Sequence, residues 1–329
     1  MNARNKPACP DCDSGLDRRD FLRAAGAAAA LGAAVPSLFF PHVAHAAPTA
    51  SSAAESAVGR LYGSLSEEQK KAICFPFDHE LRGKISANWQ ITKPSIDDKF
   101  YSKEQREIIH EIVKNITTPD GYERILKQTE DDNGGMGAYA VAIFGEPGSG
   151  KFQWEMTGRH LTMRADGNSV DKAAFGGPIV YGHGEEDPKN NLFHYQTQQT
   201  NEVFKALDAK QRKQALVAQA PAESAVDLQG ESGKFPGIAV SELSSDQKEL
   251  VEKTLKVLLA PYRQEDVDEV MEVLKAGGGV DQLHMAFYAQ GDLKDDSVWD
   301  IWRVEGPSFV WHFRGAPHVH AYINIGIKS

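Results

Sequence analysis

Two histidines close to the C-terminus, His318 and His320, have the spacing of a metal chelate. Residues two apart on a β-strand point to the same face, about 7 Å apart along the chain, and two imidazoles at that separation can bind one ion. Surface strands also carry such pairs without a metal. The sequence therefore predicts His318 and His320 as metal ligands, provided that further ligands reach the same face.

A third histidine, His312, lies on the preceding predicted strand, and the register of the hairpin decides whether it joins the pair. If Phe313 pairs with His318, His312 lies opposite Val319 and faces away. If His312 pairs with His318, all three histidines share one face. The sequence leaves both registers open, so His312 is a conditional ligand.

His160 is a further candidate, distant in the sequence from the others. On a strand over residues 160–164 it belongs to the polar side, and Glu155 on the preceding predicted strand is an acidic partner for it. The alternative is a structural histidine held by hydrogen bonds. The expected metal centre contains His160, His318 and His320, completed by His312 or Glu155. It leaves an open position for water or substrate, and imidazole ligands suit copper, zinc or iron better than magnesium or calcium.

Residues 145–151, Gly-Glu-Pro-Gly-Ser-Gly-Lys, match the first seven positions of a phosphate-binding loop. The eighth position is Phe152 instead of the Ser or Thr that binds magnesium. Residues 152–156 then alternate like a strand, where the motif requires the N-terminus of a helix to receive phosphate. We interpret residues 145–151 as a hairpin turn and expect no nucleotide cofactor.

The first 46 residues are typical of a twin-arginine signal peptide. Arg18 and Arg19 precede the apolar stretch Ala24 to Phe40, and Ala44-His45-Ala46 forms a cleavage site of the small-x-small type. The expected partner is the twin-arginine export machinery, which carries folded proteins and often proteins that already hold a cofactor. We therefore expect a periplasmic or extracellular protein.

The composition excludes several classes of partner. The chain has a formal net charge of −10 and no basic stripe, so nucleic acid is not expected. No second long apolar run follows the leader, so no membrane span is expected after cleavage. Cys9 and Cys12 form a Cys-x-x-Cys pair inside the leader, which leaves Cys74 as an isolated cysteine that we interpret as a small core residue.

Four segments share one helix-start pattern, in which a Ser or Asp can cap the helix and a Gln three positions later completes a capping box. The caps are Ser66, Ser102, Asp208 and Ser244. A fifth helix is expected from Glu265 to Lys275, before three glycines. We attribute the recurrence to capping chemistry rather than to four copies of a domain.

Between and after these helices the hydrophobic period changes to two, which predicts strands. The predicted strands cover residues 139–144, 152–156, 160–164, 179–181, 283–288, 298–304, 308–313 and 318–325. Clustered helices and hairpin-like blocks of strands favour an α+β fold, a mainly antiparallel sheet with about five helices packed against it. Residues 47–60, rich in Ala and Ser, are expected to be a flexible lead-in, and residues 61–329 a single α+β domain.

Several short motifs together resemble a known family: Phe75-Pro76-Phe77-Asp78, Ala142-Ile143-Phe144-Gly145-Glu146-Pro147, Gly158-Arg159-His160-Leu161, and Glu305-Gly306-Pro307-Ser308-Phe309 followed by His318-Val319-His320. They are similar to the bacterial family catalogued as domain of unknown function 3500, over most of the mature chain. The resemblance implies an exported protein and assigns no activity.

The chain departs from that family pattern at two positions. The pattern usually shows Gly-His-His-Leu where this chain has Arg159 before His160, and members tend to carry an acid where this chain has His312. One potential ligand is thus replaced by a permanent cation. The resemblance therefore implies that the ligands of a metal site in this chain have shifted toward imidazole.

Three functions are compatible with these features. The first is a metal-dependent oxidoreductase or hydrolase that uses the histidine site. The second is a non-catalytic periplasmic protein that binds a small ligand or sugar in an aromatic pocket, although aromatic residues at strand spacing are more often core. The aromatic candidates for that pocket are Trp154, Trp299, Trp302 and Trp311. The third is a metal-free hydrolase using Glu155 or Glu305 with His160.

Overall fold

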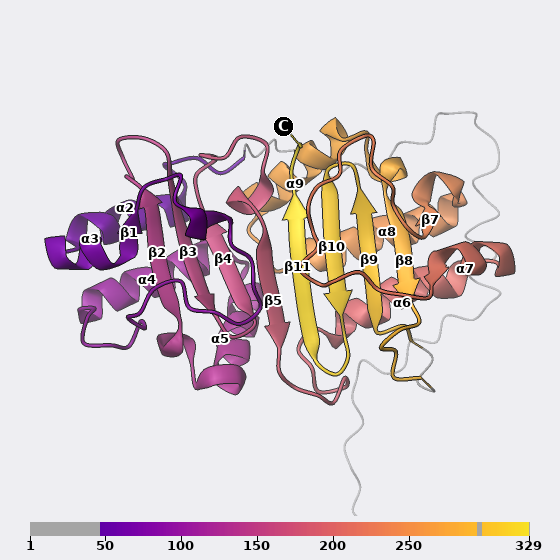
Figure 1. Cartoon of the computed structure of the whole chain (residues 1–329), viewed down its shortest axis with the longest axis horizontal. Helices are drawn as coiled ribbons and strands as arrows, with labels where there is room; N and C mark the ends of the chain where they lie inside the picture. Colours follow the sequence, from indigo (N-terminus) through magenta and orange to yellow (C-terminus); the bar gives the residue numbers. More distant parts are fainter. Residues whose placement is uncertain (1–46, 295–297, 329) are drawn as a thin grey trace, which may run out of the picture. The chain divides into compact units, whose positions relative to one another are not determined.

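A single eleven-stranded sheet, mostly antiparallel, carries helices on one face (Figure 1). The computed structural model describes residues 47–294 and 298–328, so the predicted signal peptide lies outside the described residues. The α-helices of the described part are α2 (Ala53–Ser64), α3 (Glu67–Ile73), α4 (Lys103–Asn115), α5 (Pro119–Asn133), α6 (His194–Ala206), α7 (Ala209–Ala215), α8 (Ser245–Leu259) and α9 (Gln264–Ala276). This confirms the expected α+β class.

The strands are β1 (Cys74–Phe75), β2 (Ala140–Gly145), β3 (Phe152–Gly158), β4 (Leu161–Ala165), β5 (Ile179–His183), β6 (Leu216–Val217), β7 (Ile238–Ala239), β8 (His284–Tyr288), β9 (Ile301–Gly306), β10 (Phe309–Arg314) and β11 (Val319–Ile325). Short 3-10 helices η1 to η5 lie at Glu80–Gly83, Met136–Ala138, Ala174–Gly176, Val240–Glu242 and Val280–Gln282.

Across the sheet the strands lie in the order β1-β2-β3-β4-β5-β11-β10-β9-β8-β6, with β7 paired to β8 off this path. Inward from each edge the strands follow chain order, β1 to β5 from one edge and β6, β8, β9, β10 and β11 from the other. The outer pairs β1–β2 and β6–β8 are parallel, and the pairs between them are antiparallel. The chain therefore builds two similar halves that meet at the pair β5–β11 in the middle of the sheet (Figure 1).

The four predicted capping boxes are all present, and they pair within the halves. Gln69 and Gln105 donate to each other's side-chain oxygens at 2.9 and 3.1 Å, and Gln211 and Gln247 do the same at 3.0 and 2.8 Å. In both pairs the glutamines are 36 residues apart. The recurrence therefore marks an internal duplication as well as capping chemistry, and the sequence interpretation missed this duplication.

Matched strands repeat the same buried residues. Trp154 lies four residues before Gly158 at the end of β3, and Trp302 lies four residues before Gly306 at the end of β9. Both tryptophans are fully buried, as is Trp311. These side chains belong to the main core and are not exposed to line a ligand pocket.

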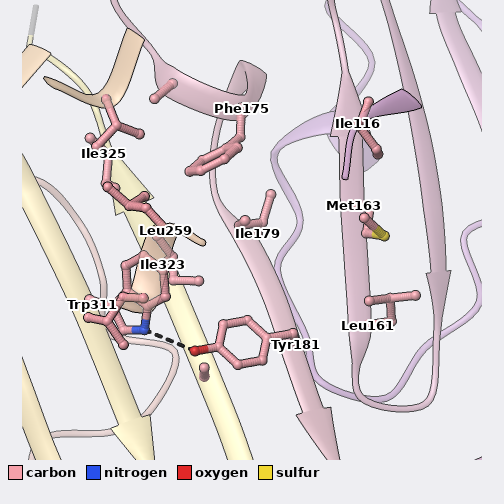
Figure 2. Packing of buried hydrophobic residues seen from close by; sticks show 14 of the residues in the cluster. Ile116, Leu161, Met163, Phe175, Ile179, Tyr181, Leu259, Trp311, Ile323 and Ile325 are labelled. Atoms are coloured by element: carbon pink, nitrogen blue, oxygen red, sulfur yellow. Dashed lines mark hydrogen bonds between the residues drawn. The ribbon is translucent and has the colours of Figure 1, made fainter. Parts of the chain in front are cut away.

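The main core lies between the sheet and the helices. Tyr181 of β5 and Trp311 of β10 are buried there, and Trp311 Nε1 donates a hydrogen bond to Tyr181 Oη at 3.3 Å (Figure 2). Because β5 belongs to the first half and β10 to the second, this bond joins the two halves across their shared boundary.

Two long loops cover the opposite face of the sheet, as Figure 1 shows for residues 76–100 and 218–237. The backbone N–H of Ala87, in the first loop, donates to Tyr322 Oη at 3.0 Å. Ala225, in the second, accepts a hydrogen bond from a side chain of β9 at 2.9 Å. The loops therefore seal polar side chains of the strands against water.

Residues 47–60 are not a flexible lead-in over most of their length, because α2 begins at Ala53. Glu55 in this helix is buried and accepts two hydrogen bonds from Arg263, at 2.9 and 2.7 Å. Small alanines on α2 pack into the core, so a composition that suggested disorder instead allows close helix packing. The folded domain therefore begins before residue 61.

The helix count of about five is too low, because α2, α5 and α6 are not among the five helices expected from start and stop signals. Helix α6 has no side-chain cap and a polar sequence, so it lacks the capping box that identified four of those helices. His160 also lies outside the expected strand: it occupies the turn between β3 and β4 with φ of 57°.

The interpretation of residues 145–151 as a hairpin turn is confirmed, because Gly145 of β2 pairs with Phe152 of β3 in an antiparallel register. A strand therefore follows the glycines, where a phosphate-binding loop would need a helix. In the described ranges, none of the helices is long and apolar enough to cross a membrane.

Candidate metal centre

Three of the predicted ligands come together at one point, although they come from opposite halves of the chain. His160, His318 and His320 each offer a ligand atom, and these atoms all lie within 4.8 Å of one another. The ring centroids form a nearly equilateral triangle, with sides of 5.0, 4.8 and 4.8 Å. The Nε2 atoms of His318 and His320 are 3.1 Å apart.

This triangle fits a transition-metal ion. Tetrahedral coordination with bonds of about 2.1 Å separates the ligating nitrogens by about 3.4 Å, and the rings behind them by about 5 Å. The observed ring separations of 4.8 and 5.0 Å match that requirement closely. Small side-chain rotations would therefore bring the nitrogens into position.

The sheet topology explains how the ligands meet. Strand β11, which carries His320, pairs with β5, and β5 pairs with β4, so the residue just before β4 lies near the start of β11. At that point His160 donates its backbone N–H to Ala87 O at 2.5 Å. Gly182 on β5 leaves room for it, because a Cβ at Gly182 would lie 3.1 Å from the Cβ of His160.

Asp132 in the last turn of α5 fixes the orientation of His160. Its Oδ2 lies 2.8 Å from His160 Nδ1, and its Oδ1 accepts the Gly184 N–H at 2.7 Å. Burial opposes ionisation of this carboxyl, but hydrogen bonds from His160, from Gln128 and from Gly184 outweigh burial and lower its pKa. Asp132 is therefore an acceptor, and His160 Nδ1 carries the hydrogen.

Glu223 in the second covering loop does the same for His320. Its Oε2 lies 2.8 Å from His320 Nδ1, and its Oε1 pairs with Arg314 at 2.9 Å. Burial of Glu223 is again outweighed, here by the hydrogen bond from His320 and the charge of Arg314, so its pKa is lowered. Nδ1 of both histidines is thus occupied, and in the neutral rings both Nε2 lone pairs are free for a metal.

The surroundings of His318 and His320 favour the neutral imidazole, the form that binds a metal. Burial and the nearby charges of His320 and Arg314 lower the pKa of His318 to about 4. Burial also lowers the pKa of His320, although its bond to Glu223 opposes this effect.

His312 does not join these three residues. The hairpin adopts neither expected register: Arg314 pairs with His320, and His312 lies opposite Tyr322. This pairing does place His312 on the same face as His320, but its Nδ1 accepts a hydrogen bond from Arg303 Nε at 3.3 Å. Burial and the charge of Arg303 lower its pKa to about 3. His312 is therefore a structural histidine.

Glu155 is also held elsewhere. It is fully buried and forms an ion pair with Arg164, which also donates to Arg82 O and Pro178 O at 2.6 Å each. Burial raises the pKa of Glu155 to about 7 despite this partner. The carboxylates beside the metal-ligand candidates are Asp132 and Glu223 instead, so Glu155 has no place in the centre.

The sequence did not identify these two carboxylates as functional residues. Asp132 lies 28 residues from His160, and Glu223 lies 97 residues from His320. The available signals were weak: Asp132 precedes the helix-ending Gly134, and Glu223 lies in a polar connector. Neither position suggests a histidine partner without the fold.

The second half of the chain does not repeat the His160 position of the metal centre. His160 immediately precedes β4, and the matching residue before β10 is Ser308, which is buried and donates to Val273 O at 3.3 Å. Only the first half therefore supplies an imidazole from this turn.

Comparison with known proteins gives one match. No curated protein and no solved structure matches the chain significantly. One family, described as protein of unknown function (DUF3500), matches residues 47–323, which include all three histidines and both carboxylates. The chain belongs to this DUF3500 family.

Proposed function

We propose that the protein is an exported, metal-dependent hydrolase whose ion is bound by His160, His318 and His320. The observation that carries the proposal is the pair of carboxylate–histidine contacts, Asp132 to His160 and Glu223 to His320, both at 2.8 Å through Nδ1. Such contacts typically orient metal-binding histidines.

The ligand number favours a catalytic site over a structural one. Three protein ligands leave one tetrahedral position for water or substrate, as in catalytic zinc sites, whereas structural sites are closed by four. His318 and His320 are only partly buried, so the centre is reached from solvent on their side. His160 is buried behind them.

The ion and the side chains would have separate tasks. A bound Zn²⁺ ion would act as a Lewis acid that polarises a substrate carbonyl or activates water. Asp132 and Glu223 would keep His160 and His320 in the tautomer that offers Nε2. The side chain of Arg314 would hold the Glu223 carboxylate in place, since the two are 2.9 Å apart.

Metal analysis of protein purified from the periplasm, without affinity tag or chelator, tests the proposal. We expect one equivalent of zinc in the wild type and loss of that metal in the double variant His318→Ala, His320→Ala. His110→Ala is the matched control, because His110 lies on α4 and contacts Tyr122 instead. Absence of stoichiometric metal from the wild type contradicts the proposal, and copper or iron in place of zinc redirects it to an oxidoreductase.

A further inference from the structure

An arginine with no ion-pair partner borders the metal centre. Arg159 immediately precedes His160, is exposed, and forms no ion pair with any residue that the structure describes. A guanidinium without an ion-pair partner offers charged hydrogen-bond donors to a ligand.

Gly184 lies where the guanidinium of Arg159 and the ring of His160 come close together. A Cβ built at Gly184 would lie 3.3 Å from Arg159 Nη2 and 3.4 Å from His160 Cε1. It would also lie 2.7 Å from Asp132 Oδ1. Neighbouring atoms therefore fill the position of a side chain at residue 184, and a glycine there lets Arg159 and His160 approach each other.

The charges around Arg159 favour an anion. The two carboxylates of the centre are already committed: Asp132 to His160 and Gly184, and Glu223 to His320 and Arg314. A divalent ion bound by neutral imidazoles would add two positive charges, and Arg159 adds a third that has no ion-pair partner among the described residues. The carboxylate of Glu185, which follows Gly184, is also engaged within the protein, because it accepts a hydrogen bond from the Asp187 N–H at 2.9 Å.

We propose that Arg159 binds an anionic group of the substrate, a carboxylate or a phosphate, and holds it beside the metal ion. A planar guanidinium binds such oxyanions through two parallel hydrogen bonds, which gives orientation as well as affinity. Small anionic compounds are then the substrate class of the hydrolase. This inference rests on the proposed metal centre and names what that centre acts on.

Cobalt substitution separates the two proposals in one experiment. Co²⁺ is titrated into the metal-free full-length mature protein, and binding is followed by calorimetry and by visible absorption. Acetate, inorganic phosphate and the neutral acetamide are then titrated into the cobalt protein. We expect one Co²⁺ per chain and a change in the cobalt spectrum with acetate or phosphate but not with acetamide. Acetate and phosphate distinguish the two kinds of oxyanion.

The variant Arg159→Gln locates the anion. It should bind Co²⁺ with unchanged stoichiometry and bind the preferred anion about tenfold more weakly, or worse, because a charge-assisted pair is lost. Arg60→Gln is the matched control, since Arg60 is an exposed arginine of α2 paired with Glu111, and it should leave anion binding unchanged.

Each contrary outcome has a distinct meaning. If Co²⁺ does not bind the wild type, the metal centre is wrong and this inference falls with it. If Co²⁺ binds but neither anion does, or if Arg159→Gln binds anions as well as the wild type does, the inference is overturned while the metal centre stands.

Discussion

The Nε2 atoms of His318 and His320 face each other at 3.1 Å. Because Glu223 accepts the hydrogen on Nδ1 of His320, Nε2 of the neutral ring is an acceptor, and His318 Nε2 must donate to it when no ion is bound. An ion at this point would bind the Nε2 lone pairs of both rings once the Nε2 hydrogen of His318 has moved to Nδ1, and it would replace that single bond.

Metal binding should therefore raise the thermal stability of the protein. An ion at 1,000 times its dissociation constant adds about 4 kcal/mol to the free energy of unfolding, and this corresponds to a rise in Tm of about 7 °C for a chain of this size. Calorimetric scans of the chelator-treated protein with and without zinc measure the rise. An equal shift in the His318→Ala, His320→Ala variant would assign it to another site.

Loss of an orienting carboxylate should weaken metal binding without abolishing it. Asp132→Asn and Glu223→Gln are each expected to lower the affinity for zinc by about 10- to 100-fold. Asp131→Asn is a matched control, because Asp131 is the neighbour of Asp132 but pairs with His183 at 3.1 Å. Competition titrations with a zinc indicator measure the affinities. Equal effects of the Asp131 and Asp132 variants would argue against a specific role for Asp132.

The buried ion pair of Glu55 and Arg263 should make the start of the mature chain essential to stability. In the wild type the Glu55 carboxylate accepts two hydrogen bonds from Arg263, and Glu55→Gln removes its charge. We expect the free energy of unfolding to fall by about 3 kcal/mol. Urea unfolding measures this loss. The substitution Ser51→Ala, at an exposed position before α2, should change little. A silent Glu55 variant would mean that α2 is not docked as described.

Stability should fall as the pH rises from about 6.5 to about 8, because three buried acids near Arg263 have raised pKa values. Burial is the main cause in each, with pKa about 6 for Asp166, about 7 for Asp266 and about 8 for Glu269. In the unfolded chain these groups ionise near pH 4. The folded state therefore holds more protons in this window, and raising the pH favours unfolding.

Urea unfolding of the metal-free protein between pH 6.5 and pH 8.5 checks this dependence, since in this range the histidines with lowered pKa values are mostly neutral in both the folded and the unfolded chain. Glu269→Gln should flatten the upper part of the curve and stabilise the protein at pH 8. A stability that is constant or increases over this range would contradict the assignment of the buried acids as neutral.

Export should depend on the paired arginines. Replacing Arg18 and Arg19 by lysine is expected to keep the unprocessed chain in the cytoplasm, because the twin-arginine route recognises that pair. Cell fractionation followed by immunoblotting measures the distribution. Undiminished periplasmic protein from the lysine variant would assign export to a different route.

The sequence could predict features that depend on neighbouring residues. The capping boxes follow from a Ser or Asp and a Gln three positions later, and all four occur. The chelate spacing of His318 and His320 similarly depends on one strand alone. Features that depend on the order of strands in the sheet could not be predicted from the sequence. His160 lies beside this pair only because β5 pairs with β11.

Hairpin register and duplication show the same limit. The last hairpin closes with Arg314 opposite His320, so its turn lies two residues further along the chain than in the expected pairing of His312 with His318. The two halves repeat some residues but not others, since the Glu155–Arg164 pair of β3 and β4 corresponds in place to Arg303 and His312 of β9 and β10. Similar positions with exchanged chemistry leave little trace in a single sequence.

The most direct test of the metal centre is a crystal structure of the natively purified protein, with anomalous diffraction recorded on both sides of the absorption edge of the metal found by elemental analysis. The account predicts one strong anomalous peak about 2.1 Å from Nε2 of His160, His318 and His320. No peak within the triangle of these rings, or a peak bound by other residues, would contradict it.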